Sequence, residues 1–104
     1  MAGFRRGSTP TNVFNVNVDL TGATVFVSYS QFNKVVIEKT GAALTVTSTS
    51  VETTLTQAET LALQDGFVEI QIRYIDSDGT ADASNIIHVD AGRILKDGVI
   101  TYAV

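Results

Sequence analysis

The segment from Gly66 to Asp90 constrains the fold more than any other part of the sequence. Between Val68 and Tyr74 apolar and polar side chains alternate strictly, which is the period of a β-strand with one buried and one solvated face. An Asp-Gly pair at positions 78 and 79 separates this run from a second apolar run that ends at Asp90. Asp-Gly between two apolar runs is the strongest short-range indication of a hairpin, because both residues tolerate positive φ angles. The sequence therefore predicts a central β-hairpin.

Length and composition exclude several classes of protein. The chain has 104 residues and no cysteine, so it has the size of one domain and cannot hold disulfides, a thiolate metal site or a cysteine nucleophile. Its net charge of −4 argues against nucleic-acid binding, which needs a positive field. No apolar run approaches the length of about 18 residues that a membrane span needs, and no secretory signal follows Arg5 and Arg6. We expect synthesis in the cytoplasm, with no nucleic-acid or membrane partner.

The remaining apolar pattern divides the chain into further short strands. The expected strands cover residues 14–20, 25–29, 34–39, 44–47 and 50–55. Three consecutive apolar residues from Val35 to Ile37 favour a central position for the third of them. Thr56 and Glu59 fit a capping box, so one short helix is predicted over residues 57–63, before the sixth strand.

This pattern predicts an all-β fold. About seven short strands with regularly spaced turns are typical of an antiparallel sandwich, which we prefer to a closed barrel. A helical turn between the fifth and sixth strands is a common crossing between the sheets of immunoglobulin-like folds. We therefore expect an immunoglobulin-like sandwich over residues 12–90, preceded by an N-terminal arm at 1–11 and followed by a C-terminal extension at 91–104.

The residues that carry chemistry elsewhere have simpler explanations here. Residues 76–79 resemble the start of a calcium loop, but Ile87 stands where an EF-hand needs a glutamate, and a turn explains them. His88 is the only histidine, cannot form a zinc site alone, and is interpreted as a surface or interface residue. Spacing shows no converging pair of carboxylates. We predict no catalytic, cofactor-binding or metal-binding residue, and hence a protein that is not an enzyme.

Exposed aromatic side chains leave an alternative open. Phe26, Phe32 and Tyr102 can serve as stacking platforms of a carbohydrate-binding module that contacts the host cell surface. Such sites favour tryptophan, which the chain lacks, and packing in the core or at a sheet edge is the simpler interpretation.

The two ends of the chain are candidate assembly surfaces. Arg5 and Arg6 are the only adjacent basic residues, and the arm that carries them is either frayed in solvent or docked on an acidic neighbouring subunit. The extension is rich in large apolar side chains: Ile94, Leu95, Val99, Ile100, Tyr102 and Val104. It can pack on its own domain or be donated to a neighbouring subunit's sheet edge or groove.

Several stretches resemble one family of proteins. They are 19–23 (DLTGA), 36–39 (VIEK), 55–60 (LTQAET), 68–73 (VEIQIR) and 92–100 (GRILKDGVI). With these stretches the chain is similar to small tailed-phage and prophage proteins, in particular to the N-terminal immunoglobulin-like domain of phage baseplate upper proteins. The likeness covers most of residues 12–100.

The resemblance implies a structural role in a virion. It implies that the protein works in a baseplate, tail, neck or head decoration, among other phage structural proteins and copies of itself, as a homo-oligomer without cofactors. Longer relatives carry a further domain near the position where this sequence stops, so a small adaptor or decorating subunit is expected.

Overall fold

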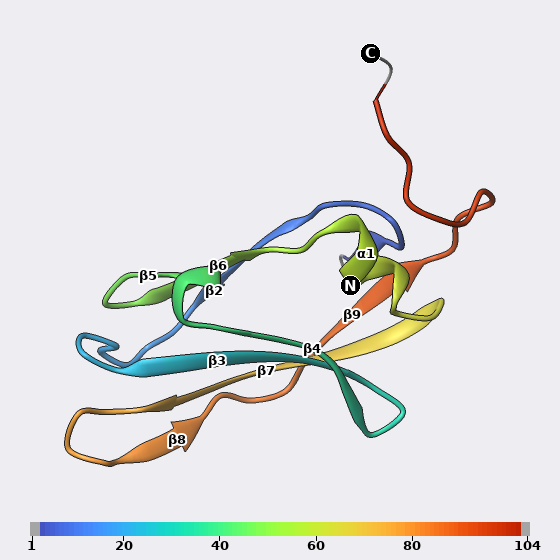
Figure 1. Cartoon of the computed structure of the whole chain (residues 1–104). Helices are drawn as coiled ribbons and strands as arrows, with labels where there is room; N and C mark the ends of the chain where they lie inside the picture. The colour runs from blue at the N-terminus through green and yellow to red at the C-terminus, as the bar shows by residue number, and fades with distance from the viewer. Residues whose placement is uncertain (1–2, 103–104) are drawn as a thin grey trace.

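Two β-sheets face each other in the computed structural model, which describes residues 3–102 (Figure 1). The six-stranded sheet contains β1 (Phe4–Arg5), β3 (Thr24–Gln31), β4 (Lys34–Thr40), β7 (Gly66–Ile75), β8 (Ala81–Ala83) and β9 (Ile87–Gly92). The three-stranded sheet contains β2 (Thr11–Asn15), β5 (Thr45–Val46) and β6 (Ser50–Thr54). A single turn of 3₁₀-helix, η1 (Gly41–Ala43), and the helix α1 (Gln57–Leu61) lie where the chain passes from one sheet to the other. The predicted all-β sandwich with one short helix is confirmed.

Strand β7 is the centre of the larger sheet, whose order is β1-β9-β7-β3-β4 with β8 also paired to β7. The predicted hairpin is present: the Asp76 N–H donates to Thr80 O (2.8 Å), and Gly79 takes a φ of 89° in the turn. The returning strand is interrupted between β8 and β9. There the backbone N–H of Ile72 donates to the Ser84 hydroxyl (3.0 Å) while the Ser84 N–H donates to Ile72 O (2.8 Å), so a side chain replaces one of the two backbone bonds. This break and the extra strand β1 raise the expected seven strands to nine within residues 3–102.

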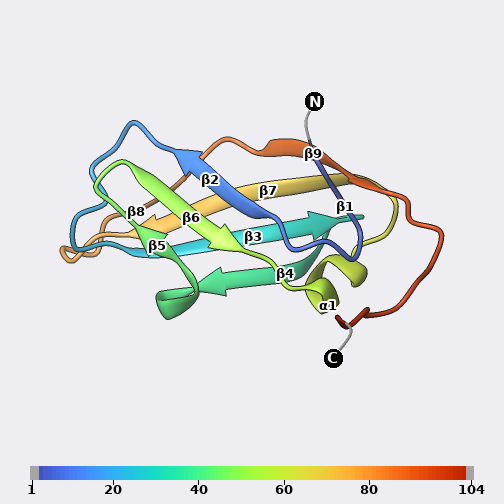
Figure 2. The same ribbon diagram turned by 90° about the horizontal axis from the view of Figure 1, so that it is seen from above.

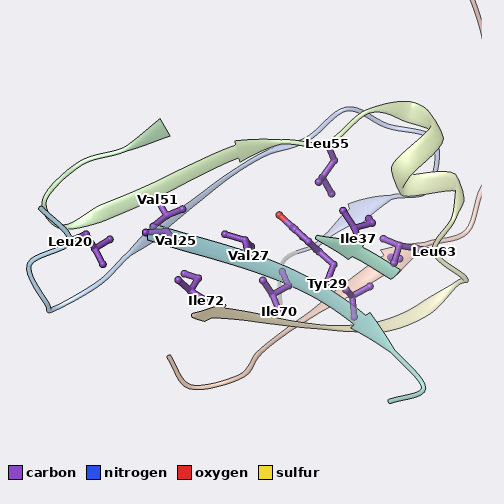
Figure 3. Close-up of a cluster of buried hydrophobic side chains, with 12 residues drawn as sticks. Leu20, Val25, Val27, Tyr29, Ile37, Val51, Leu55, Leu63, Ile70 and Ile72 are labelled. Atoms are coloured by element: carbon purple, nitrogen blue, oxygen red, sulfur yellow. The ribbon is translucent and has the colours of Figure 1, made fainter. Parts of the chain in front are cut away.

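The core lies between the two sheets (Figure 3). Alternate residues of β3 and β7 point into it, as the sequence predicted, and Leu55 and Val51 cover them from the other sheet. The buried apolar residues are Leu20, Val25, Val27, Tyr29, Ile37, Val51, Leu55, Leu63, Val68, Ile70, Ile72 and Ala91. The Tyr29 hydroxyl donates to Asn12 Oδ1 on β2 (2.7 Å) and so joins the sheets. Burial of this phenol raises its pKa above the ordinary value.

Two predictions about strands are wrong. The expected strand at 14–20 is β2, which ends at Asn15; Val18 lies 36% exposed in the following loop. The Asp19 carboxylate accepts hydrogen bonds from the hydroxyl (2.7 Å) and the N–H (3.0 Å) of Thr21, and so folds this loop into a turn. The same two hydrogen bonds lower the pKa of Asp19. Strand β4 lies at an edge of the sheet and not in its centre. A register shift in its pairing with β3 leaves Val35 52% exposed.

The capping box at the start of α1 is confirmed. The Glu59 N–H donates to the Thr56 hydroxyl (3.1 Å), and the Thr56 N–H donates to the Glu59 carboxylate (2.8 Å). The helix ends at Leu61 and not at Leu63, which is buried after the helix. Helix α1 lies at one end of the sandwich, between the two sheets (Figure 1).

Candidate interaction surfaces

The N-terminal arm packs on its own domain. Strand β1 pairs in parallel with the end of β9. Gly3 lies so close to the Asp90 backbone that a Cβ there would clash with Asp90 O. The Thr60 hydroxyl donates to Ser8 O (2.8 Å) and fastens the arm to α1. Residues 3–10 are thus tied to the sandwich and are not frayed in this structure.

Arg6 makes the strongest contacts of this arm. Its guanidinium donates from Nε to Leu63 O (2.6 Å), just beyond α1, and from Nη2 to the carbonyl of Leu61 (2.9 Å), the last residue of α1. A longer contact of 3.5 Å joins Nη2 to the exposed Asp97 carboxylate. Arg5 donates to Arg93 O (2.8 Å) at the surface. Both arginines contact their own chain, and a further contact with a neighbouring subunit stays a prediction.

The C-terminal extension passes over α1 and then leaves the body of the molecule (Figure 1). Gln57 holds it there through two hydrogen bonds: its amide donates to Ile100 O and accepts the Ile100 N–H, both at 2.9 Å. Ile94 is half-buried, whereas most of the other large apolar side chains are exposed: Leu95 (91%), Val99 (59%), Ile100 (58%) and Tyr102 (88%). Val104 was also predicted here but lies outside the described residues.

A groove runs between the sheets beside β2. Figure 2 shows the course of β2 across the larger sheet. It has a volume of about 540 Å³ and is lined by both layers, with Phe14 and Val16 from the β2 side and Ile70, Ile87 and Val89 from the larger sheet. Strand β2 is the outer strand of its sheet, so its second edge has no partner strand among residues 3–102. Donation of the extension to a neighbour's sheet edge or groove stays a prediction, and this groove is a candidate acceptor. The sequence did not indicate the groove, because an edge position depends on which strands pair.

Two exposed phenylalanines gather at one end of the larger sheet. Phe32 (78% exposed) occupies the tight turn between β3 and β4, with a φ of 53°, and Phe67 (75% exposed) is the second residue of β7. Both line one surface hollow together with Asp65 and Glu69. Packing was the simpler interpretation for Phe26, Phe32 and Tyr102, but only Phe26 is half-buried, whereas Phe32 and Tyr102 are exposed. Phe67 was missed, although its alternation with the buried Val68 placed it on the outer face.

The titratable groups form surface contacts. His88 Nε2 lies 3.3 Å from Glu69 Oε2 on the outer face of the sheet. Asp78 accepts the Thr80 N–H (2.9 Å), which lowers the Asp78 pKa and fits the predicted turn. Within residues 3–102, no group of three or more His, Cys, Asp or Glu side chains is placed to hold a metal ion.

Lys39 and Glu59 form the shortest ion pair within residues 3–102, with 2.7 Å between Nζ and Oε2. Desolvation raises the Glu59 pKa, but hydrogen bonds from Lys39 and from the Thr56 backbone outweigh it, so the net pKa lies below its ordinary value. The pair joins the edge strand β4 to α1. Its position and bonding give it a structural role.

The fold and surfaces define an all-β sandwich with a partly detached apolar segment. No helix within residues 3–102 is long and apolar enough to cross a membrane. Comparisons with family models, curated proteins and solved structures give no significant match.

Proposed function

We propose that the protein is a non-enzymatic structural subunit of a bacteriophage particle or phage-tail-like machine, built on an immunoglobulin-like sandwich. The observation that carries this proposal is the exposure of the apolar C-terminal segment, in which Leu95 (91%) and Tyr102 (88%) contact almost nothing. Soluble monomers rarely leave contiguous apolar surface uncovered, and such surface marks interaction sites. The resemblance to phage baseplate upper proteins supplies the setting.

Assembly in a virion fits weak individual contacts. A subunit present in many copies gains avidity from simultaneous contacts, so a short segment of a few apolar side chains suffices. Its partners are copies of itself and other phage structural proteins, and its location is the virion. The immunoglobulin-like topology is supported by the helix that crosses between two mainly antiparallel sheets.

Incorporation into particles tests the proposal. We expect the wild-type protein in purified particles at a fixed ratio to the other structural proteins, measured by quantitative mass spectrometry. The double variant Leu95→Ser, Tyr102→Ser removes two apolar contacts that are each worth about 1.5–3 kcal/mol when fully buried. Incorporation should therefore fall by roughly tenfold or more, while the thermal unfolding of the free protein stays unchanged.

A matched control comes from the sandwich itself. Val46 on β5 is 39% exposed, so Val46→Ser changes surface hydropathy away from the extension and should leave incorporation unchanged. A wild-type protein that is absent from particles would contradict the proposed function.

The exposed phenylalanines favour a second candidate function, a carbohydrate-binding module that contacts the host cell surface. Phe32 and Phe67 line one hollow with Asp65 and Glu69, and aromatic faces beside carboxylates can hold a sugar ring through stacking and hydrogen bonds. Titration with host cell-wall polysaccharide distinguishes the two functions. Saturable binding that Phe32→Ala and Phe67→Ala each abolish would support the module, whereas an assembly subunit binds no sugar.

A further inference from the structure

We infer that the groove beside β2 accepts residues 98–102 of a second copy of this chain, which add a strand to the outer edge of β2. This inference rests on the proposed function. The partner is a second copy of the chain, and the two contact surfaces are residues 98–102 and the outer edge of β2. Addition of a strand to an exposed sheet edge is a general mode of recognition, in which backbone hydrogen bonds supply affinity and side-chain pockets supply specificity.

The backbone of β2 offers the required groups. The Val16 N–H, just after the strand, donates to Thr49 O on the β6 side (2.8 Å). Backbone groups in an antiparallel pair alternate in direction, so those of Thr11, Val13 and Asn15 face the opposite, outer edge. No hydrogen bond to the backbone N–H or C=O of these three residues other than strand pairing is found within residues 3–102.

Strand β2 is also a weakly protected edge of the fold. Natural proteins guard edge strands with charges, with proline or by keeping them very short. The edge strand β4 carries Lys34, Glu38 and Lys39, and β1 and β5 have 2 residues each. Strand β2 has 5 residues, TNVFN, without a charge or a proline. An uncharged edge of this length is suited to pairing.

The groove matches the segment in length and polarity. Residues 98–102, GVITY, carry no charge and equal β2 in length. In an extended segment alternate side chains share one side, so Ile100 and Tyr102 point together into the groove while Val99 points away. Phe14, Val16, Ile87 and Val89 supply the apolar lining there.

The occupant comes from another molecule because the chain's own segment is held elsewhere. The two 2.9 Å hydrogen bonds from Gln57 to the Ile100 backbone keep it on the α1 side, where Figure 1 shows it leaving the body. The same bonds hold the segment outside its own core, where a partner can reach it. Each copy thus offers one donor segment and one acceptor edge, an arrangement that builds rings or chains.

Sedimentation velocity of the full chain over a range of concentrations tests the inference. We expect concentration-dependent association that Ile100→Asp weakens by roughly tenfold or more, because the carboxylate would be buried without a partner. Val99→Asp is the matched control, because Val99 (59%) is as exposed as Ile100 (58%) but points away from the groove. It should leave association within about twofold of wild type, since a surface charge costs little.

Two measurements examine the acceptor. Val13→Pro removes an N–H of the outer edge without removing a bond to β6, and should abolish association, whereas Val13→Thr should keep it. If Val13→Pro does not fold, hydrogen exchange on the wild type decides. The amides of Thr11, Val13 and Asn15 should become protected as concentration rises.

Three results would overturn the inference. They are a chain that stays monomeric at every concentration, association that Ile100→Asp and Val99→Asp affect equally, and protection of the β2 amides that does not depend on concentration. The last would show that the segment pairs within its own molecule. A monomeric chain that is still incorporated into particles would refute this inference while leaving the proposed function intact.

Discussion

Replacing Arg6 by alanine should destabilise the isolated protein, because this side chain joins the N-terminal arm to the end of α1. Its guanidinium donates to Leu63 O at 2.6 Å and to Leu61 O at 2.9 Å, and the side chain is only 20% exposed. The last carbonyls of a helix have no intrahelical partner, and a cation beside them also interacts favourably with the helix dipole.

The magnitude follows from these contacts. Hydrogen bonds from a charged donor contribute about 1.5–3 kcal/mol each. In the variant, water can hydrogen-bond to the two freed carbonyls and recover part of this contribution, because the site is partly open to solvent. The Asp97 pair adds little, since its carboxylate is 75% exposed and 3.5 Å away. We expect Arg6→Ala to lower the free energy of unfolding by about 2–3 kcal/mol, and Tm by roughly 10–20 °C for a domain of this size.

Urea unfolding followed by circular dichroism measures this loss. Arg6→Lys keeps the charge but not the forked donor geometry, so it should recover only part of the stability. Arg5→Ala is the matched control, because Arg5 donates one exposed hydrogen bond, to Arg93 O, and should cost less than about 1 kcal/mol. An Arg6→Ala variant that unfolds within about 0.5 kcal/mol of wild type would refute the reasoning and restore a purely intersubunit role for the arm.

Two further predictions concern α1 and the β3–β4 turn. Glu59 has a lowered pKa, so its ion pair with Lys39 contributes stability at pH values above the ordinary value of 4.5 and loses it as pH falls through the lowered pKa. Urea unfolding at pH 7 and pH 3 should show a smaller loss for Glu59→Gln than for wild type; an equal loss would contradict this. Phe32 has a φ of 53°, which is costly for an aromatic residue, so Phe32→Asn should raise the free energy of unfolding by about 0.5–1 kcal/mol. A lower Tm would show that Phe32 packs usefully where it is.

The sequence predicted the centre of this fold well because local pattern and burial agree there. The alternation from Val68 to Tyr74 became the inner and outer faces of β7, and the capping box of Thr56 and Glu59 started α1 where expected. Both features depend on residues within a few positions of one another. Their outcome therefore changes little with the remainder of the chain.

The errors arose where pairing between distant segments decides the structure. Val35 belongs to an apolar run that is typical of a central strand, yet no later strand pairs with the outer edge of β4 within residues 3–102, because the chain crosses to the other sheet after it. Val18 fits the alternation of β2, but the hydrogen bonds between Asp19 and Thr21 bend the chain. Such side-chain contacts with the backbone compete with the strand ladder.

Of the two candidate surfaces, the sequence predicted the apolar extension but not the acceptor edge, because the edge depends on pairing between distant segments. The apolar residues of the extension, such as Ile100 and Tyr102, stand out in the sequence because nothing nearby in the pattern accounts for them. The acceptor does not stand out, because TNVFN reads like any half-buried strand until its place in the sheet is known.

The two sheets differ in size, and this difference connects the open groove with the exposed C-terminal extension. A three-stranded sheet cannot cover the whole inner face of a six-stranded one, so apolar residues such as Ile87 and Val89 stay half-buried along the open side. One more strand beside β2 would complete that layer, and residues 98–102 have the length and alternation to supply it. Gln57 holds the chain's own segment away from the groove, so in the proposed assembly a neighbouring copy would complete the layer. Folding and the proposed assembly would then use the same apolar surface, and many weak contacts between copies would add to the stability of each domain.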